Sequence, residues 1–145
     1  MKNLRGFLLG AIFVLFAVSP VRPATFKLDL RQSPWELRPG LSTTVWSYGG
    51  EVPGTPIVVN PGERVTVEVT NNLPEPTNIH WHGLVVPNDQ DGPAIDIRPG
   101  ERFTYEFTPR ESGTYWYHPH RRPVLPQLDR GLYGAFIVRA PEDEK

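Results

Sequence analysis

The most regular segment of the chain reads Arg64-Val65-Thr66-Val67-Glu68-Val69-Thr70-Asn71. Its valines alternate with polar side chains. Because successive side chains of a β-strand point to opposite faces of a sheet, this alternation predicts a strand with one buried face and one face in water. The pair Pro61-Gly62 precedes the segment, as is typical of a turn that leads into a strand. We therefore expect at least one sheet, and the flanking sequence extends the pattern.

Segments of the same kind fill most of the chain beyond residue 24. They are short, rich in β-branched and aromatic residues, separated by proline and glycine, and free of helical periodicity. This pattern is typical of an all-β sandwich or barrel. The remaining length of about 120 residues suffices for one domain, which we place at residues 25–145. The predicted strands are 27–30, 44–48, 56–60, 64–71, 78–84, 101–107, 114–118 and 133–138.

Residues 1–24 have the composition of an export signal. Lys2 and Arg5 precede an uncharged apolar run at 6–18, and Ser19 and Pro20 begin a possible cleavage zone that ends at Ala24. The apolar run is short for a membrane span. The sequence leaves open whether this leader is removed or kept as an anchor. In both cases we expect an exported protein, periplasmic or extracellular.

Composition excludes several classes of function. The chain has no cysteine, so neither a disulfide framework nor a thiolate site is available. Its formal net charge is −1, and three of its 15 basic residues lie in the leader, so residues 25–145 are net acidic. A nucleic-acid-binding domain needs clustered basic surface. We therefore expect no nucleic-acid partner.

The four histidines form two pairs, His80-Trp81-His82 and His118-Pro119-His120, each in strand-like sequence. In a strand each pair presents two imidazoles on one face, with α-carbons about 6.5–7 Å apart. Two such strands side by side would bring four nitrogen donors together, a set that suits zinc, copper, iron or nickel. The alternative is that these are ordinary histidines. Clustering of all four argues against it, because histidine is commonly a metal ligand.

Neighbouring residues constrain the second pair and suggest no further chemistry. Pro119 has no amide hydrogen, so residues 118–120 must lie at a strand end or at a sheet edge. Trp81 and Trp116 flank the histidines. Because buried aromatic residues dominate the cores of β-sandwiches, we expect both to be packing residues.

These motifs together resemble a known family. The stretches His80-Trp81-His82-Gly83-Leu84 and Gly113-Thr114-Tyr115-Trp116-Tyr117-His118-Pro119-His120 are similar to the first cupredoxin (plastocyanin-like) domain of laccase-like multicopper oxidases. Residues 48–54, 71–77 and 131–138 resemble its early turn, the lead-in to its first histidine pair and its closing strand. The resemblance covers nearly all of residues 25–145. It implies a single Greek-key β-sandwich of cupredoxin type.

The resemblance also implies a cofactor and roles for individual residues. In that family a type 1 copper takes electrons from a reducing substrate and passes them to a trinuclear copper cluster, which reduces dioxygen to water. By this resemblance His80 would bind the type 2 copper, and His82, His118 and His120 the type 3 pair. Asp91 matches an acidic residue that aids proton delivery near the type 2 copper. Without the resemblance, Asp91-Gly92 is an ordinary tight turn.

The chain also departs from the family pattern. It lacks the cysteine that a type 1 copper site requires, and it carries only half of the eight histidines of a trinuclear cluster. Three hypotheses follow. The favoured one is a first domain whose cluster is completed by a second domain or a partner chain. The second is a stand-alone exported copper carrier without turnover. The third is a structural domain with vestigial ligands.

Overall fold

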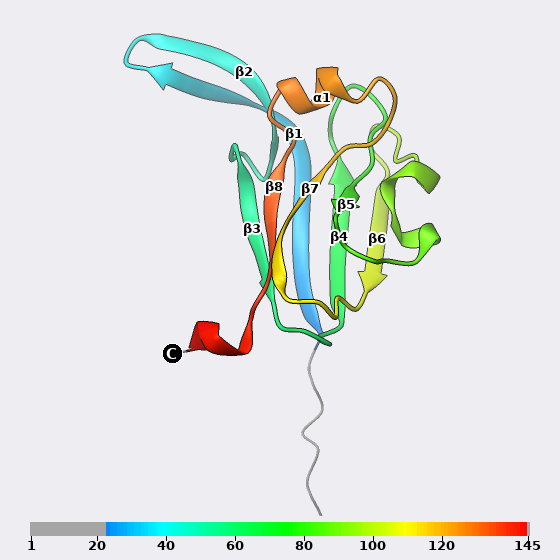
Figure 1. The fold of residues 1–145 in the computed structure, drawn as a ribbon. Coiled ribbons are helices and arrows are strands. Elements are labelled where there is room, and N and C mark those ends of the chain that lie inside the picture. The colour runs from blue at the N-terminus through cyan, green and yellow to red at the C-terminus, as the bar shows by residue number, and fades with distance from the viewer. Residues whose placement is uncertain (1–22, 145) are drawn as a thin grey trace, which may run out of the picture.

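The structure is a computed structural model that describes residues 23–144. Within this range two four-stranded sheets face each other (Figure 1). The first has the order β2-β1-β4-β6 and the second the order β3-β8-β7-β5. The expected all-β sandwich is confirmed. The strands are β1 (Ala24–Arg38), β2 (Leu41–Tyr48), β3 (Gly54–Val59), β4 (Val65–Asn71), β5 (His80–His82), β6 (Arg102–Phe107), β7 (Gly113–His118) and β8 (Gly134–Val138).

Strand pairing is mixed. β1 runs parallel to β4 and β3 runs parallel to β8, whereas the other neighbours are antiparallel. The strand predicted from alternation is β4, and its three valines are at most 1% exposed. They face the space between the sheets, as the alternation requires.

Trp81 lies at the centre of the core. It is fully buried, and its ring contacts aromatic rings from both sheets: Tyr105, Phe107, Tyr117 and Phe136. Because alternate residues of a strand face opposite sides, a core-facing Trp81 leaves the two flanking histidines on the opposite face of β5. The prediction that Trp81 is a packing residue is confirmed.

The first two strands form a longer hairpin than the sequence suggested. Segments 27–30 and 44–48 were expected as separate strands, but β1 alone has 15 residues and pairs with β2 as far as Arg38 and Leu41. The hairpin projects beyond the sandwich (Figure 1). Beyond Leu30, β1 pairs only with β2, so Pro34 lies in a strand with one free edge, where a missing amide hydrogen is tolerated.

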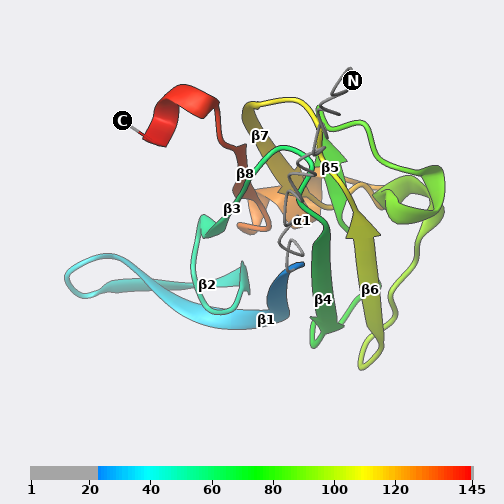
Figure 2. The same ribbon diagram turned by 90° about the horizontal axis from the view of Figure 1, so that it is seen from below.

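Short helical turns lie outside the two sheets. The turns η1 (Asn88–Gln90) and η2 (Gly92–Ala94) lie between β5 and β6, and α1 (Leu125–Asp129) and η3 (Pro141–Glu144) flank β8 (Figure 2). No helix within residues 23–144 has the length and apolar character needed to cross a membrane. Apart from Pro23 and Ala24, the predicted leader lies outside the described residues.

Candidate metal centre

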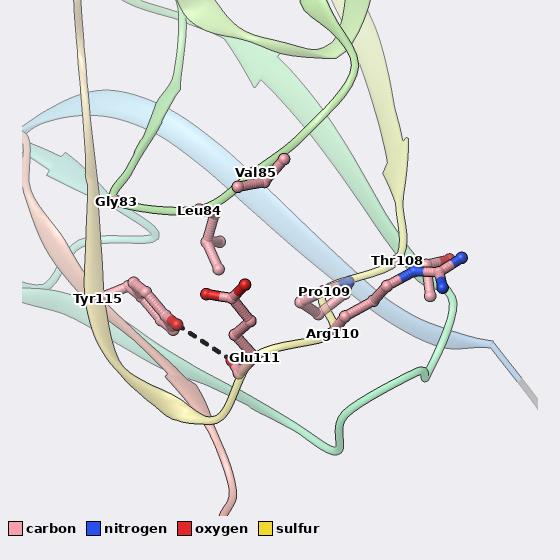
Figure 3. Close-up of a pocket in the computed structure, with 8 residues that line it drawn as sticks. All are labelled: Gly83, Leu84, Val85, Thr108, Pro109, Arg110, Glu111 and Tyr115. Atoms are coloured by element: carbon pink, nitrogen blue, oxygen red, sulfur yellow. Dashed lines mark hydrogen bonds between the residues drawn. The ribbon is translucent and has the colours of Figure 1, made fainter.

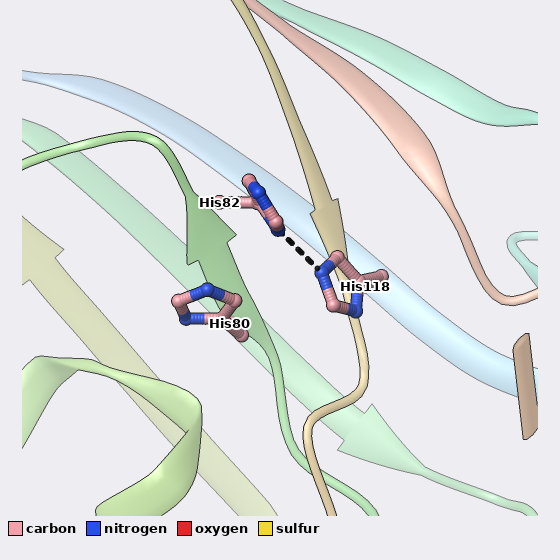
Figure 4. A group of neighbouring side chains, drawn as sticks. All are labelled: His80, His82 and His118. Atoms are coloured by element: carbon pink, nitrogen blue, oxygen red, sulfur yellow. Dashed lines mark hydrogen bonds between the residues drawn. The ribbon is translucent and has the colours of Figure 1, made fainter. Parts of the chain in front are cut away.

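The pairing of β5 with β7 brings the two histidine pairs together. The strands are antiparallel neighbours, with His80 opposite His118 and His82 opposite Trp116. The rings of His80, His82 and His118 point toward a common space (Figure 4), and one donor atom from each lies within 4.8 Å of the others. The two histidine strands thus lie side by side, the arrangement in which their nitrogen donors can converge. β7 ends at His118, so Pro119 follows a strand end, as predicted.

His82 and His118 are spaced like two ligands of one ion. The Nδ1 atom of His82 lies 3.1 Å from the Nε2 atom of His118. Two nitrogens bound to one tetrahedral metal at 2.0–2.1 Å are about 3.3 Å apart. His118 donates from Nδ1 to the carbonyl of Pro119 at 2.8 Å, which leaves a lone pair on Nε2. His82 Nδ1–H donates to that lone pair.

His80 is oriented by Asp91. Its Nδ1–H donates to Asp91 Oδ1 at 2.7 Å, so that Nε2 is free to bind a metal. The same oxygen accepts the backbone amides of Gly92 at 2.9 Å and Trp81 at 3.3 Å. A carboxylate that holds the second ring nitrogen of a histidine is a common companion of metal sites, because it fixes the tautomer and the ring orientation.

Close packing fixes the loop that carries Asp91. The backbone of Gly92 lies so near β5 that a β-carbon there would be 2.8 Å from the backbone nitrogen of His80. The Gln90 carbonyl accepts Trp81 Nε1–H at 3.0 Å, and Gln90 Oε1 accepts the Glu106 amide at 2.7 Å. Asp91 itself has extended backbone between η1 and η2. The Asp-Gly pair does begin a tight turn, in which the Ala94 amide donates to the Asp91 carbonyl at 3.2 Å, and this turn is docked on the sheet.

His120 lies on the same face but outside the three-histidine group. Its ring centroid is 5.0 Å from that of His80 and 6.4 Å from that of His118. Its backbone amide donates to Asn78 Oδ1 at 2.7 Å. The structure thus gathers all four predicted ligands in one region, with His82 and His118 in direct contact and His120 beside His80.

Trp116 differs from the prediction. It is half-buried and lies on the histidine face, where it stacks on His118 at 4.0 Å between centroids and tilts against His82 at 4.9 Å. The expectation of a core packing residue is wrong for Trp116. The spacing contained the signal, because residues 116 and 118 of one strand share a face.

The four histidines differ in burial, and the one that is buried is held in its neutral form. His118 is 5% exposed, whereas His82 is exposed and His80 and His120 are half-buried. Burial lowers the pKa of His118; the Pro119 carbonyl opposes this shift, and the three neighbouring histidines reinforce it. A neutral imidazole is the form that binds metals. Four imidazoles without a thiolate fit copper in a nitrogen-rich site.

A separate hollow lies beyond the end of β5. It measures about 210 Å³ and begins at Gly83, directly after His82 in the sequence. Figure 3 shows Tyr115 at one wall, with its hydroxyl donating to the Glu111 carbonyl at 3.0 Å. The lining is mainly apolar and includes no histidine. The candidate metal ligands therefore do not line this hollow.

Two facing sheets with an all-imidazole cluster between β5 and β7 define a cupredoxin-like metal-binding domain. Comparison with known proteins identifies the family. The sequence model of the multicopper oxidase family matches residues 29–143. The chain belongs to this family.

Individual relatives agree with this assignment. The chain is 45% identical in sequence to multicopper oxidase MmcO of Mycobacterium tuberculosis, over 67% of this chain and 19% of that protein. Copper resistance protein A of Pseudomonas syringae is 34% identical over 88% of this chain and 21% of its own length. A solved multicopper oxidase from Campylobacter jejuni, titled a metallo-oxidase, superposes with a TM-score of 0.77 and 38% identity, over 92% of this chain and 29% of that chain. The chain spans about a fifth of the length of these curated relatives.

Proposed function

We propose that this domain supplies four ligands of a trinuclear copper centre in a multicopper oxidase. His82 and His118, with His120, would hold the type 3 pair, and His80 the type 2 copper. The observation that carries the proposal is the 3.1 Å separation between His82 Nδ1 and His118 Nε2, two donors already spaced for one ion. The family membership supports copper as that ion.

We further propose that a second domain or a partner chain completes the centre. His82 is exposed, and the rings of His80 and His120 are half-buried, so the cluster faces outward rather than into the domain. A carrier would be expected to close its site with its own loops. The outward face therefore favours a shared site over a stand-alone copper carrier. The remaining cluster ligands and any type 1 site would come from the completing part.

The chain's own residues have separable tasks in this proposal. When bound, copper would supply electron transfer from a reducing substrate to dioxygen. Asp91 holds His80 in the tautomer that offers Nε2. Within residues 23–144 nothing donates to Asp91 Oδ2, which leaves this oxygen available as a proton relay. Trp116 covers one side of the His82–His118 pair.

Residues 1–24 would direct the domain out of the cytoplasm. Their basic start and apolar run support export to the periplasm or the extracellular space. We propose residues 25–145 as the cupredoxin domain. β1 begins at Ala24, one residue before this proposed boundary.

Copper titration of the purified chain tests the proposal. Cu(I) added anaerobically, in competition with a chelator of known affinity, should bind tightly to the wild-type chain and much more weakly to His118→Ala. Zn(II) added in the same way reports whether the site prefers copper. Failure of the wild-type chain to bind copper, or equal binding by the variant, would refute the assignment.

A further inference from the structure

Asn78 joins three segments that carry the candidate centre. Its side chain is 3% exposed and lies two residues before His80. The Nδ2 group donates to the carbonyls of Gly92 at 2.7 Å and Ile95 at 3.0 Å. The Oδ1 atom accepts the backbone amide of His120 at 2.7 Å. One amide therefore links the start of β5, the Asp91 loop and the end of the second histidine pair.

The three bonds fix the orientation of the amide. Two partners are carbonyls, which only accept, and the third is a backbone amide, which only donates. A flipped side chain would lose all three bonds. An apolar residue of similar size would leave the Ile95 carbonyl and the His120 amide without these partners, and buried polar groups do not stay unpaired without a local rearrangement.

The positions of His80 and His120 depend on Asn78, whereas the contact between His82 and His118 does not. Gly92 follows Asp91, which orients His80, and His120 is held through its own amide. The contact of His82 with His118 instead rests on the β5–β7 ladder, the Pro119 carbonyl and the Trp116 stack. None of these three contacts involves Asn78.

We propose that Asn78 is a positioning residue that sets the geometry of His80 and His120 jointly and leaves the His82–His118 pair unaffected. The part of this inference that concerns copper rests on the proposed function. The part that concerns ring geometry does not, because it applies to the metal-free chain.

The test compares Asn78→Leu with a matched control, Asn71→Leu. Asn71 is also buried, also donates to two carbonyls, those of Glu75 and Ile97, and also accepts one backbone amide, that of Leu73. None of these three hydrogen-bond partners belongs to a histidine pair or to the Asp91 loop. Both variants should lose stability, and only Asn78→Leu should alter the site. Nuclear magnetic resonance of the metal-free chain reads out the His80 Nδ1 proton and the His120 amide, and Cu(I) competition reads out affinity.

In Asn78→Leu we expect the hydrogen-bonded Nδ1 proton of His80 and the amide of His120 to shift, with the His82 and His118 signals unchanged. The affinity for copper bound through His80 and His120 should fall by about 10–100-fold, as is usual when a group that supports a metal ligand is removed. Asn78→Asp, which keeps the acceptor but loses both donors, should disturb His80 and spare the His120 amide. It also serves if Asn78→Leu does not fold.

Each outcome is informative. Unchanged His80 and His120 signals in both Asn78 variants would overturn the inference. So would equal disturbance of all four histidines, or the same changes in Asn71→Leu, because either would indicate a general loss of structure. A wild-type chain that binds no copper would refute the proposed function, whereas the metal-free spectra would still decide the role of Asn78.

Discussion

The histidines of the candidate metal centre differ in how far the fold surrounds them. His82 is exposed and makes no core contact, whereas His118 is buried between Trp116 and the Pro119 carbonyl. His82→Ala should therefore abolish tight copper binding and change the free energy of unfolding by no more than about 0.5 kcal/mol, as for other surface substitutions. Cu(I) competition and urea unfolding measure the two effects. Unchanged copper affinity would contradict the ligand assignment.

His118 should also make the metal-free chain sensitive to pH. Burial lowers the pKa of His118, so the unfolded chain takes up this proton near pH 6.5 while the folded chain does so only at lower pH. The unfolded state then binds more protons, and the free energy of unfolding falls as pH decreases below about 6.5. Urea unfolding at pH 7.5 and 5.5 should show a smaller decrease for His118→Gln. Equal decreases would show that His118 does not carry the effect.

Gly92 affects the orientation of His80 indirectly, through the loop that carries Asp91. A β-carbon there would come within 2.9 Å of Ile79 backbone atoms, so Gly92→Ala must push the Asp91 loop away from β5. We expect a loss of stability of about 1–3 kcal/mol, typical of overpacking, together with weaker copper binding. Gly62→Ala is the comparison, because its added β-carbon meets nothing and only its positive φ of 77° is strained. Copper binding as strong in Gly92→Ala as in Gly62→Ala would argue against the loop's role.

At the scale of elements, β5 has only three residues, and its place in the sheet depends on Trp81. The indole is buried among four aromatic rings, and a shift of one residue would turn both histidines into the core. Trp81→Ala should lower the free energy of unfolding by about 3–5 kcal/mol and remove copper binding as well. Trp35 is a half-buried residue of the β1–β2 hairpin, so Trp35→Ala should lower the free energy of unfolding by less and leave copper binding intact. Urea unfolding and copper titration of both variants make the comparison.

The sequence predicted elements better than it predicted their contacts. β4, β6 and β7 follow from local alternation, and the pairing of the two histidine strands follows from the shared spacing of their ligands. The outer part of the β1–β2 hairpin was missed. It contains Pro34 and is exposed along much of its length, so it lacks the apolar alternation by which strands are found.

For the whole molecule, the four candidate ligands could be proposed from the sequence, whereas the residues that support them could not. Histidine identity and strand periodicity are local properties. The bonds from Asn78 to Gly92, Ile95 and His120 join residues 14 to 42 positions apart, and nothing near Asn78 in the sequence marks them. The position of Gly92 against β5 likewise depends on how the loop folds back. Trp116 is the exception, because its face could have been read from its distance to His118.

The central claim is that this domain binds copper through its histidine face as one part of a larger centre. The most direct test loads the purified 145-residue chain with Cu(I) under anaerobic conditions, counts the copper bound, and then follows dioxygen uptake in air with a phenolic reductant. We expect tightly bound copper, lost in His82→Ala, without sustained dioxygen uptake. Sustained uptake that disappears in His82→Ala would contradict it, because the chain would then assemble a working centre without a completing domain. Absence of bound copper would contradict the site itself.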